Sequence, residues 1–320
     1  MSTEAEYDVI VVGAGAGGLT AARDLAAHGL KVLALDRIGV GGQVLSVEGI
    51  INFPGYDEIA GYDLGAELMM AAEDAGAEVM LTEANSLATN PAGFGLQTSQ
   101  GEFQARAVVI AVGSERKTLG VPGEDQFQGL GISHCASCDG PFFKEQRVAV
   151  VGGGDSAFDE AAVLAKSAAQ VTIFHTGATP AAKRAIINSA LANKNIEVVP
   201  HASVTEIVGG DRVTSISVRD EASGDQKEMP VDGVFVYIGL LPNTDWLSGL
   251  ATLDEDNRIV TDQRLMTTTP GLFAVGDVRS GSASLLSEAV SDGQLAAESV
   301  ASYLASAATG PTSTGSRNRG

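Results

Sequence analysis

The sequence has few aromatic and basic residues, and each shortage excludes a class of protein. Aromatic residues make up 5% of the 320 positions, so Ala, Val, Leu and Gly must fill the cores that a hydrophobic fraction of 44% allows. Lys and Arg number 20 against 40 Asp and Glu, and the net charge of −20 repels the phosphates of nucleic acids and anionic lipids. The acids are dispersed, as in cytosolic proteins of salt-adapted organisms, although an ordinary acidic protein has the same pattern.

Long apolar runs and an N-terminal cluster of bases are also missing. No run reaches the roughly 18–20 apolar residues that cross a membrane. The first stretch, MSTEAEYDVIVVG, carries acids where a signal peptide carries bases. We therefore expect a soluble, cytoplasmic protein, and we expect the small, polar residues 309–320 to be disordered.

A glycine-rich turn follows the first apolar run. VIVV predicts a buried parallel strand, and Gly13, Gly15 and Gly18 then form G-x-G-x-x-G before an Ala/Leu-rich helix. The next strand, KVLALD, ends with Asp36, 23 positions after Gly13, close to the ~20 typical of dinucleotide-binding folds. Such glycines let the backbone reach a pyrophosphate, and the acid accepts hydrogen bonds from a ribose.

A second turn of this kind appears in RVAVVGGGDSAFDEAAVLAK. The residue 23 positions after Gly152 is His175, so neither an acid for a ribose nor an arginine for a 2′-phosphate stands there. The turn is present, but the part that distinguishes NADH from NADPH is not. Asp155 adds negative charge near the pyrophosphate position. The candidate nucleotide-binding residues here are Gly152, Gly154, Asp155, Ser156 and Ala157.

Both cysteines lie in HCASCDG, residues 134–140. A zinc site needs three or four ligands, and among four histidines only His134 is near, at a spacing that no usual site has. A structural disulfide across two residues closes a small loop and stabilises little. A C-x-x-C pair cycles readily between dithiol and disulfide, so redox use is favoured, with Asp139 beside Cys138 to move the proton. We predict no metal.

A dithiol beside two dinucleotide folds implies electron transfer. Nicotinamide delivers two electrons as hydride, whereas a disulfide is opened by a nucleophile, and a flavin connects the two chemistries. One fold should therefore hold FAD and the other a donor.

The order and spacing of these motifs resemble the low-molecular-weight thioredoxin reductases, in the flavoprotein pyridine nucleotide-disulfide oxidoreductases, over residues 6–305. C-x-x-C just before the second glycine turn separates this family from relatives of glutathione reductase. The matching motifs are GAGAGG, GGQ (Gly41, Gly42 and Gln43), NFPG (from Asn52), AVG (to Gly113), CASCDG, GGGDSA, IGLLPN and GLFAVGDV (with Gly276 and Asp277).

The resemblance implies an α/β fold of two Rossmann-like, three-layer domains, the second inserted into the first. An FAD-binding domain would span residues 1–113 and 245–308, and residues 114–244 would form an NAD(P)-binding-like domain with the C-x-x-C. Asp277 would hold the ribityl chain of FAD. Cys138 would be the sulfur nearer the flavin, Cys135 would attack the partner disulfide, and Asp139 would be the acid–base group. A homodimer with rotating domains is implied.

The sequence departs from the family at two places. NADPH-dependent members carry HRRxxxR after the last strand of the second nucleotide unit, and this chain has HTGATPAAKR, retaining only His175. Where the family has Arg-Gln-Ala near the flavin pyrimidine, this chain has Ser284, Leu285 and Leu286, so only a helix N-terminus is left to provide positive charge there.

These departures leave several functions open. The first is an FAD-dependent reductase of a thioredoxin-like protein whose donor is NADPH, NADH, ferredoxin or another flavin. The second is a dithiol oxidase that passes electrons to oxygen. The third is a redox sensor without catalysis.

Overall fold

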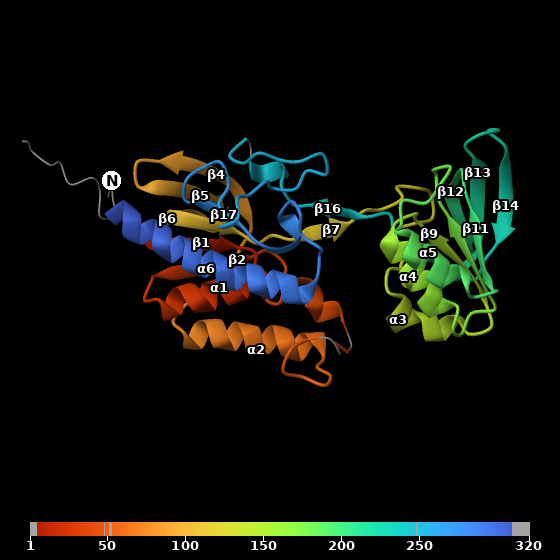
Figure 1. Cartoon of the computed structure of the whole chain (residues 1–320), viewed down its shortest axis with the longest axis horizontal. Helices are drawn as coiled ribbons and strands as arrows, with labels where there is room; N and C mark the ends of the chain where they lie inside the picture. Colours follow the sequence, from red (N-terminus) through yellow and green to blue (C-terminus); the bar gives the residue numbers. More distant parts are fainter. Residues whose placement is uncertain (1–4, 48, 51–52, 248, 309–320) are drawn as a thin grey trace, which may run out of the picture. The chain divides into compact units, whose positions relative to one another are not determined.

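The chain divides into two compact units, the second inserted into the first. The computed structural model describes residues 5–47, 49–50, 53–247 and 249–308. One unit comprises Met1–Glu115 and Pro242–Gly320, and the other comprises Arg116–Leu241 (Figure 1). These junctions lie two or three residues from the domain boundaries expected from the sequence. The chain passes between the units twice, and these two segments pair with each other as the short strands β7 (Ser114–Arg116) and β16 (Leu240–Pro242).

The first unit is built on a seven-stranded sheet in the order β3-β2-β1-β6-β5-β4, with β17 also paired to β6. Strands β1, β2, β3, β6 and β17 run parallel, and β4 and β5 add an antiparallel hairpin. The strands are β1 (Tyr7–Val12), β2 (Val32–Asp36), β3 (Glu78–Leu81), β4 (Ala84–Asn90), β5 (Gly93–Thr98), β6 (Gly101–Ile110) and β17 (Leu272–Ala274).

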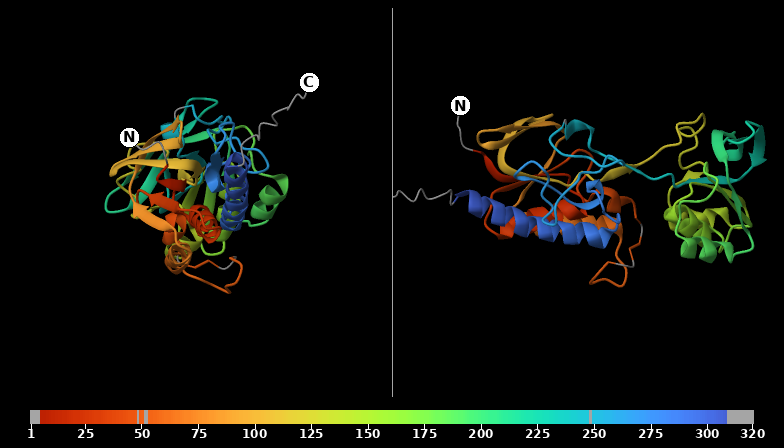
Figure 2. Two further views of the ribbon diagram at one scale, coloured as in Figure 1. Left: turned by 90° about the vertical axis from the view of Figure 1, so that its left-hand side faces the viewer. Right: turned by 45° about the horizontal axis from the view of Figure 1, so that its top comes forward.

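Both faces of this sheet are buried, which explains the uninterrupted apolar run of β1. Val9 and Val11 pack into a core with α1 (Ala16–Ala27) and α6 (Leu286–Ala308), whereas Ile10 and Val12 face a second core. Helices α1 and α6 lie side by side (Figures 1 and 2), with α2 (Gly61–Asp74) also packed against α1. The short 3₁₀ helices are η1 (Gly42–Ser46), η3 (Asp245–Leu247) and η4 (Gly276–Val278).

The second unit has a five-stranded parallel sheet in the order β11-β10-β9-β15-β8 and a three-stranded antiparallel sheet, β12-β13-β14. One face of the parallel sheet packs against α4 and α5, and the other packs against the antiparallel sheet. The elements are β8 (Ile132–Ser133), α3 (Ala136–Asp139), η2 (Gly140–Phe143), β9 (Arg147–Val151), α4 (Asp155–Leu164), β10 (Gln170–Phe174), α5 (Arg184–Leu191), β11 (Ile196–Val199), β12 (Ala202–Gly209), β13 (Val213–Asp220), β14 (Gln226–Pro230) and β15 (Gly233–Val236).

This architecture confirms the expected fold class of two Rossmann-like α/β folds. Strands β12 and β13 form an antiparallel hairpin in the second unit, and α6 is the C-terminal helix of the first. Among the described residues, no helix is both long and apolar enough to cross a membrane.

Candidate functional site

The first glycine turn connects β1 to α1, and each of its three glycines has a different steric environment. Gly13 has φ +104°, and a Cβ there would lie 2.3 Å from the Ala111 carbonyl oxygen. A Cβ on Gly18 would lie 1.9 Å from the Gly13 carbonyl oxygen, so this glycine lets the helix pack on the turn. Gly15 is different, because the nearest atom to its Cβ position is 4.0 Å away. That open side, beside the first N–H groups of α1, fits a pyrophosphate.

Asp36 ends β2, and its carboxylate is hydrogen-bonded to the turn. One carboxylate oxygen accepts from the Ala14 N–H at 2.9 Å, and the other accepts from Ile38 and Gly39 at 3.0 and 3.1 Å. A carboxylate has about four acceptor positions, so the three backbone bonds leave one for a ribose hydroxyl.

The GGQ segment folds over the open side of this turn. Gly41 donates its N–H to the Ala14 carbonyl at 2.7 Å, and a Cβ on Gly42 would lie 2.9 Å from the Gly15 Cα. The side-chain amide of Gln43 donates to the Ser114 carbonyl at 2.6 Å, next to Gly113. The structure thus brings four predicted cofactor-binding residues, Gly41, Gly42, Gln43 and Gly113, to the first turn. Asn52, also predicted, lies outside the described residues.

Gly276 and Asp277 form the start of η4 and complete the first unit's candidate site. Burial raises the pKa of the Asp277 carboxyl, the charges of Glu288 and Asp292 add to this, and Arg258 and the Ser114 hydroxyl oppose it. The Ser114 hydroxyl is 3.5 Å from the carboxylate. A partly buried carboxylate with so few donors fits a ligand that brings hydroxyl groups, as a ribityl chain does.

Two features near Asp277 bear on the positive charge that the family's arginine would provide: the start of α6 and the side chain of Arg279. Helix α6 begins at Leu286, so its N-terminus lies where the sequence predicts it. Arg279 lies two residues after Asp277, but its guanidinium is paired with Asp292 at 2.8 Å and with Glu288 at 3.3 Å. Its charge is therefore compensated within the protein.

The second glycine turn, between β9 and α4, repeats the steric pattern of the first. Gly152 has φ +144°, and a Cβ there would lie 2.1 Å from the Tyr237 carbonyl oxygen. Gly154 has no atom within 4 Å of its Cβ position, and Ala157 is fully buried. The turn therefore keeps the open side that a pyrophosphate needs, and Ser156 is exposed beside it.

The segment after β10 folds back onto this turn. Ala182 donates its N–H to the Gly153 carbonyl at 3.0 Å. Lys183 donates its N–H to Asp155 at 2.7 Å and places its ammonium 3.0 Å from the same carboxylate. These bonds lower the pKa of Asp155. The negative charge of Asp155 is thus paired with the Lys183 ammonium.

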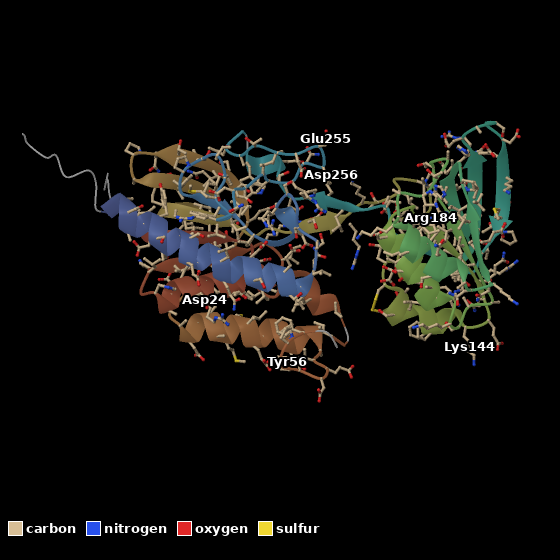
Figure 3. The ribbon with its side chains drawn as sticks, viewed as in Figure 1. Asp24, Tyr56, Lys144, Arg184, Glu255 and Asp256 are labelled. Atoms are coloured by element: carbon tan, nitrogen blue, oxygen red, sulfur yellow. A yellow bond between two sulfur atoms is a disulfide. The ribbon has the colours of Figure 1, made fainter. Side chains whose placement is uncertain are left out.

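Among the described residues directly after β10, no cation lies where a 2′-phosphate would need one. His175 is 5% exposed, its Nε2 atom has no hydrogen-bond partner, and burial lowers its pKa. Thr176 and Gly177 are exposed, and Arg184, the next arginine, begins α5 (Figure 3). The glycine turn is formed, but the described residues directly after β10 include no arginine that could recognise a 2′-phosphate.

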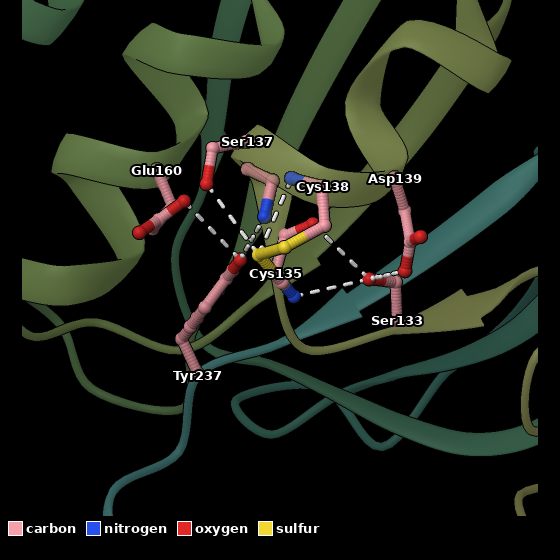
Figure 4. The surroundings of a disulfide bond; sticks show 8 residues. Ser133, Cys135, Ser137, Cys138, Asp139, Glu160 and Tyr237 are labelled. Carbon is pink, nitrogen blue, oxygen red and sulfur yellow. Dashed lines mark hydrogen bonds between the residues drawn. A yellow bond between two sulfur atoms is a disulfide. The ribbon is translucent and has the colours of Figure 1, made fainter. Parts of the chain in front are cut away.

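Cys135 and Cys138 form a disulfide at the start of α3 (Figure 4). The Cys135 sulfur accepts from the Cys138 N–H at 3.3 Å and lies 3.4 Å from the Ser137 hydroxyl. On one side, the Ser133 hydroxyl donates to the Asp139 carboxylate at 2.6 Å, and its oxygen accepts from the Cys135 N–H at 3.0 Å. The disulfide predicted as redox-active is thus formed, with Asp139 held beside it.

Tyr237 and Glu160 lie on the other side of the disulfide, and the sequence analysis did not identify them. The Tyr237 oxygen accepts from the Ala136 N–H at 2.9 Å, and its hydroxyl donates to Glu160 at 3.4 Å. Both pKa values are raised, chiefly by burial. The useful signal would have been the strand pairing, because Phe235 is opposite Ser133, and Tyr237 and Cys135 each follow two residues later in the chain.

Comparison with known proteins gives a consistent result over almost the whole chain. The family model of the pyridine nucleotide-disulphide oxidoreductases matches residues 7–293. A thioredoxin reductase of Treponema pallidum is 38% identical over 302 residues, which are 94% of this chain and 98% of that protein. The crystal structure of Lactococcus lactis thioredoxin reductase matches with a TM-score of 0.79 and 34% identity, covering 94% of this chain and all of that one. The T. acidophilum thioredoxin reductase has a TM-score of 0.76, 36% identity and coverages of 94% and 99%.

Proposed function

Since the chain belongs to the pyridine nucleotide-disulphide oxidoreductase family, we propose that it is a flavoenzyme of the thioredoxin-disulfide reductase type. Its substrate is the disulfide of a thioredoxin-like protein. The observation that carries this proposal is the Cys135–Cys138 disulfide with Asp139 and Ser133 beside it, in a chain whose first glycine turn fits FAD. The homodimer and the cytoplasmic location stay predictions.

The residues divide the work as follows. Gly13, Gly15, Gly18, Asp36 and Asp277 would hold FAD, which would supply the two electrons that open the disulfide. Cys138 is the sulfur that meets these electrons, and Asp139 gives or takes its proton, held in place by the Ser133 hydroxyl. The Cys135 thiolate then attacks the partner's disulfide and forms a mixed disulfide. Cys138 attacks Cys135 in turn, which releases the partner as a dithiol and restores the Cys135–Cys138 bond.

The donor is the least family-like part of the proposal. NADPH should bind weakly, because the residues after His175 provide no arginine for its 2′-phosphate. NADH lacks that phosphate, but it also meets no acid for its ribose. We therefore propose that another electron carrier, of which ferredoxin and a free flavin are candidates, reduces the protein faster than either nucleotide.

One anaerobic experiment tests both parts. The purified yellow protein is mixed in parallel with NADPH, NADH, reduced ferredoxin and dithiothreitol, and the loss of oxidised-flavin absorbance is followed. Bleaching by a carrier, followed by reduction of thioredoxin, supports the reductase. Hydrogen peroxide formed from a dithiol and oxygen, without reduction of thioredoxin by any donor, would replace the reductase with an oxidase. A folded protein that takes up no FAD would refute both.

A further inference from the structure

Reducing a disulfide to two thiols consumes two electrons and two protons, one proton for each sulfur. The proposed function, on which this inference rests, assigns Asp139 to Cys138 and leaves Cys135 without a proton source. Asp139 is held by Ser133 on one side of the disulfide. Figure 4 shows a second carboxyl group, Glu160, on the opposite side, with the Tyr237 hydroxyl between it and Cys135.

We propose that Glu160, acting through the hydroxyl of Tyr237, provides the proton that the Cys135 sulfur takes up when the Cys135–Cys138 bond is reduced. The S–S bond breaks and the two electrons leave one thiolate on each sulfur. Asp139 protonates Cys138, and the Tyr237 hydroxyl passes a proton to Cys135 while receiving one from Glu160. The same route takes the proton back when the Cys135 thiolate attacks the partner's disulfide. Glu160 is thus a positioning residue for the proton, and the Tyr237 hydroxyl, which lies between Glu160 and Cys135 in Figure 4, delivers it.

The geometry carries this assignment. Tyr237 follows β15, in which Phe235 pairs with Ser133 of β8, two residues before Cys135. Its oxygen is fixed by the N–H of Ala136, the residue bonded to Cys135, at 2.9 Å. The Tyr237–Glu160 distance of 3.4 Å is long for a hydrogen bond, and catalytic hydrogen bonds often shorten only when the reacting state forms.

The charges around the pair suit a proton store. Burial raises the pKa of Glu160 and the Asp159 charge adds to this, whereas the Ala136 N–H and the Tyr237 hydroxyl oppose it. Tyr237 also has a raised pKa, through burial and through Glu160, with Arg116 opposing. Tyr237 therefore stays a neutral hydroxyl, and Glu160 holds a proton at a higher pH than an exposed glutamate does.

The first test needs neither flavin chemistry nor a donor. Because the chain has two cysteines, full-length Cys138→Ser protein carries Cys135 as its only thiol, and the rate of its alkylation by iodoacetamide between pH 5.5 and 10 gives the Cys135 pKa. Glu160→Gln in this background should lower that pKa by about one unit, or about tenfold in alkylation rate at pH 7, because a neighbouring carboxylate is lost.

The matched control is Asp159→Asn, which removes the same charge from the exposed neighbouring position on α4 and should change the rate less than about threefold. Equal titration curves for the parent, Glu160→Gln and Asp159→Asn would overturn the inference and leave the proposed function intact. If Glu160→Gln does not fold, Glu160→Asp keeps the charge one methylene further away and should give a smaller shift of the same sign.

The second test measures the proton transfer in protein with both cysteines. The flavin is reduced by light with EDTA as the sacrificial electron source, without a nicotinamide or protein donor, and its reoxidation by the protein's own disulfide is followed across pH. Glu160→Gln and Tyr237→Phe should each slow this step about tenfold at the pH where Glu160 is protonated, and should match the wild type well above it. Wild-type protein that fails to transfer electrons would refute the proposed function. Variants that match the wild type at every pH would refute only the role of Glu160 and Tyr237.

Discussion

The choice of electron donor gives the sharpest test, because two residues should be enough to change it. Thr176→Arg combined with Gly177→Arg places two cations directly after β10, where both positions are exposed. A 2′-phosphate carries up to two negative charges, and each charge-assisted hydrogen bond gained contributes about 1.5–3 kcal/mol, or roughly ten- to hundred-fold in affinity. The NADPH dissociation constant should therefore fall at least about tenfold, and that for NADH should hardly change, because NADH lacks the phosphate.

The assay is anaerobic stopped-flow reduction of the flavin at increasing NADPH or NADH. A matched control, Ala222→Arg with Ser223→Arg, adds the same charge to the exposed turn between β13 and β14 of the same unit and should leave both nucleotides unchanged. Fast reduction of wild-type protein by micromolar NADPH would refute the reasoning. An arginine pair without effect would show that the turn, with Lys183 bound to Asp155, does not accept the nucleotide.

Three further predictions concern the disulfide and the FAD site. If Cys138 is the sulfur that meets the flavin, as proposed, Cys135→Ser leaves its thiolate free and should show a long-wavelength charge-transfer band, and Cys138→Ser should not. The opposite spectra would reverse the two roles. Gly15→Ala, whose Cβ would lie 4.0 Å from the nearest atom, should fold but bind FAD more weakly. Gly18→Ala, whose Cβ would lie 1.9 Å from a carbonyl oxygen, should lose thermal stability. Circular dichroism and flavin content separate the two variants, and equal behaviour would contradict the steric argument. The raised pKa of Asp277 means that the FAD-free protein loses stability as pH rises from the ordinary carboxyl pKa through the raised one. Asp277→Asn should therefore raise the melting temperature of the FAD-free protein at pH 7, leave it unchanged at pH 3, and weaken FAD binding. A lower melting temperature at pH 7 would show that the carboxylate is stabilising.

The glycine turns could be predicted from the sequence because their requirements are local. Gly13 and Gly152 need a positive φ and a close approach to a neighbouring strand, and the residues that impose these conditions repeat in a fixed order between strand and helix. The C-x-x-C pair is equally local, since two intervening residues are enough to determine that its sulfurs meet.

The rest of the candidate site depends on pairings between distant segments. Tyr237 is about a hundred positions from Cys135 and reaches it only because β15 pairs with β8 in parallel. Glu160 joins them from α4, where the adjacent acid, Asp159, is exposed to solvent. Lys183 lies in the sequence 28 positions after Asp155. Its bond to Asp155 depends on how the loop after β10 folds back, and no short-range pattern encodes that.

The paired strands β7 and β16 have a consequence for how such enzymes diversify. The inserted segment leaves and re-enters the first unit through neighbouring strands, and strands in a sheet lie about 5 Å apart. Each unit also closes its own side of the junction: Lys117 donates to the Gly239 carbonyl at 3.0 Å, and Asn243 donates to the Gly113 carbonyl at 3.3 Å. A recombination event at these two strands would therefore transplant the whole disulfide-bearing segment, with Ser133, Asp139, Glu160 and Tyr237 in place, into the flavin-binding frame of a relative.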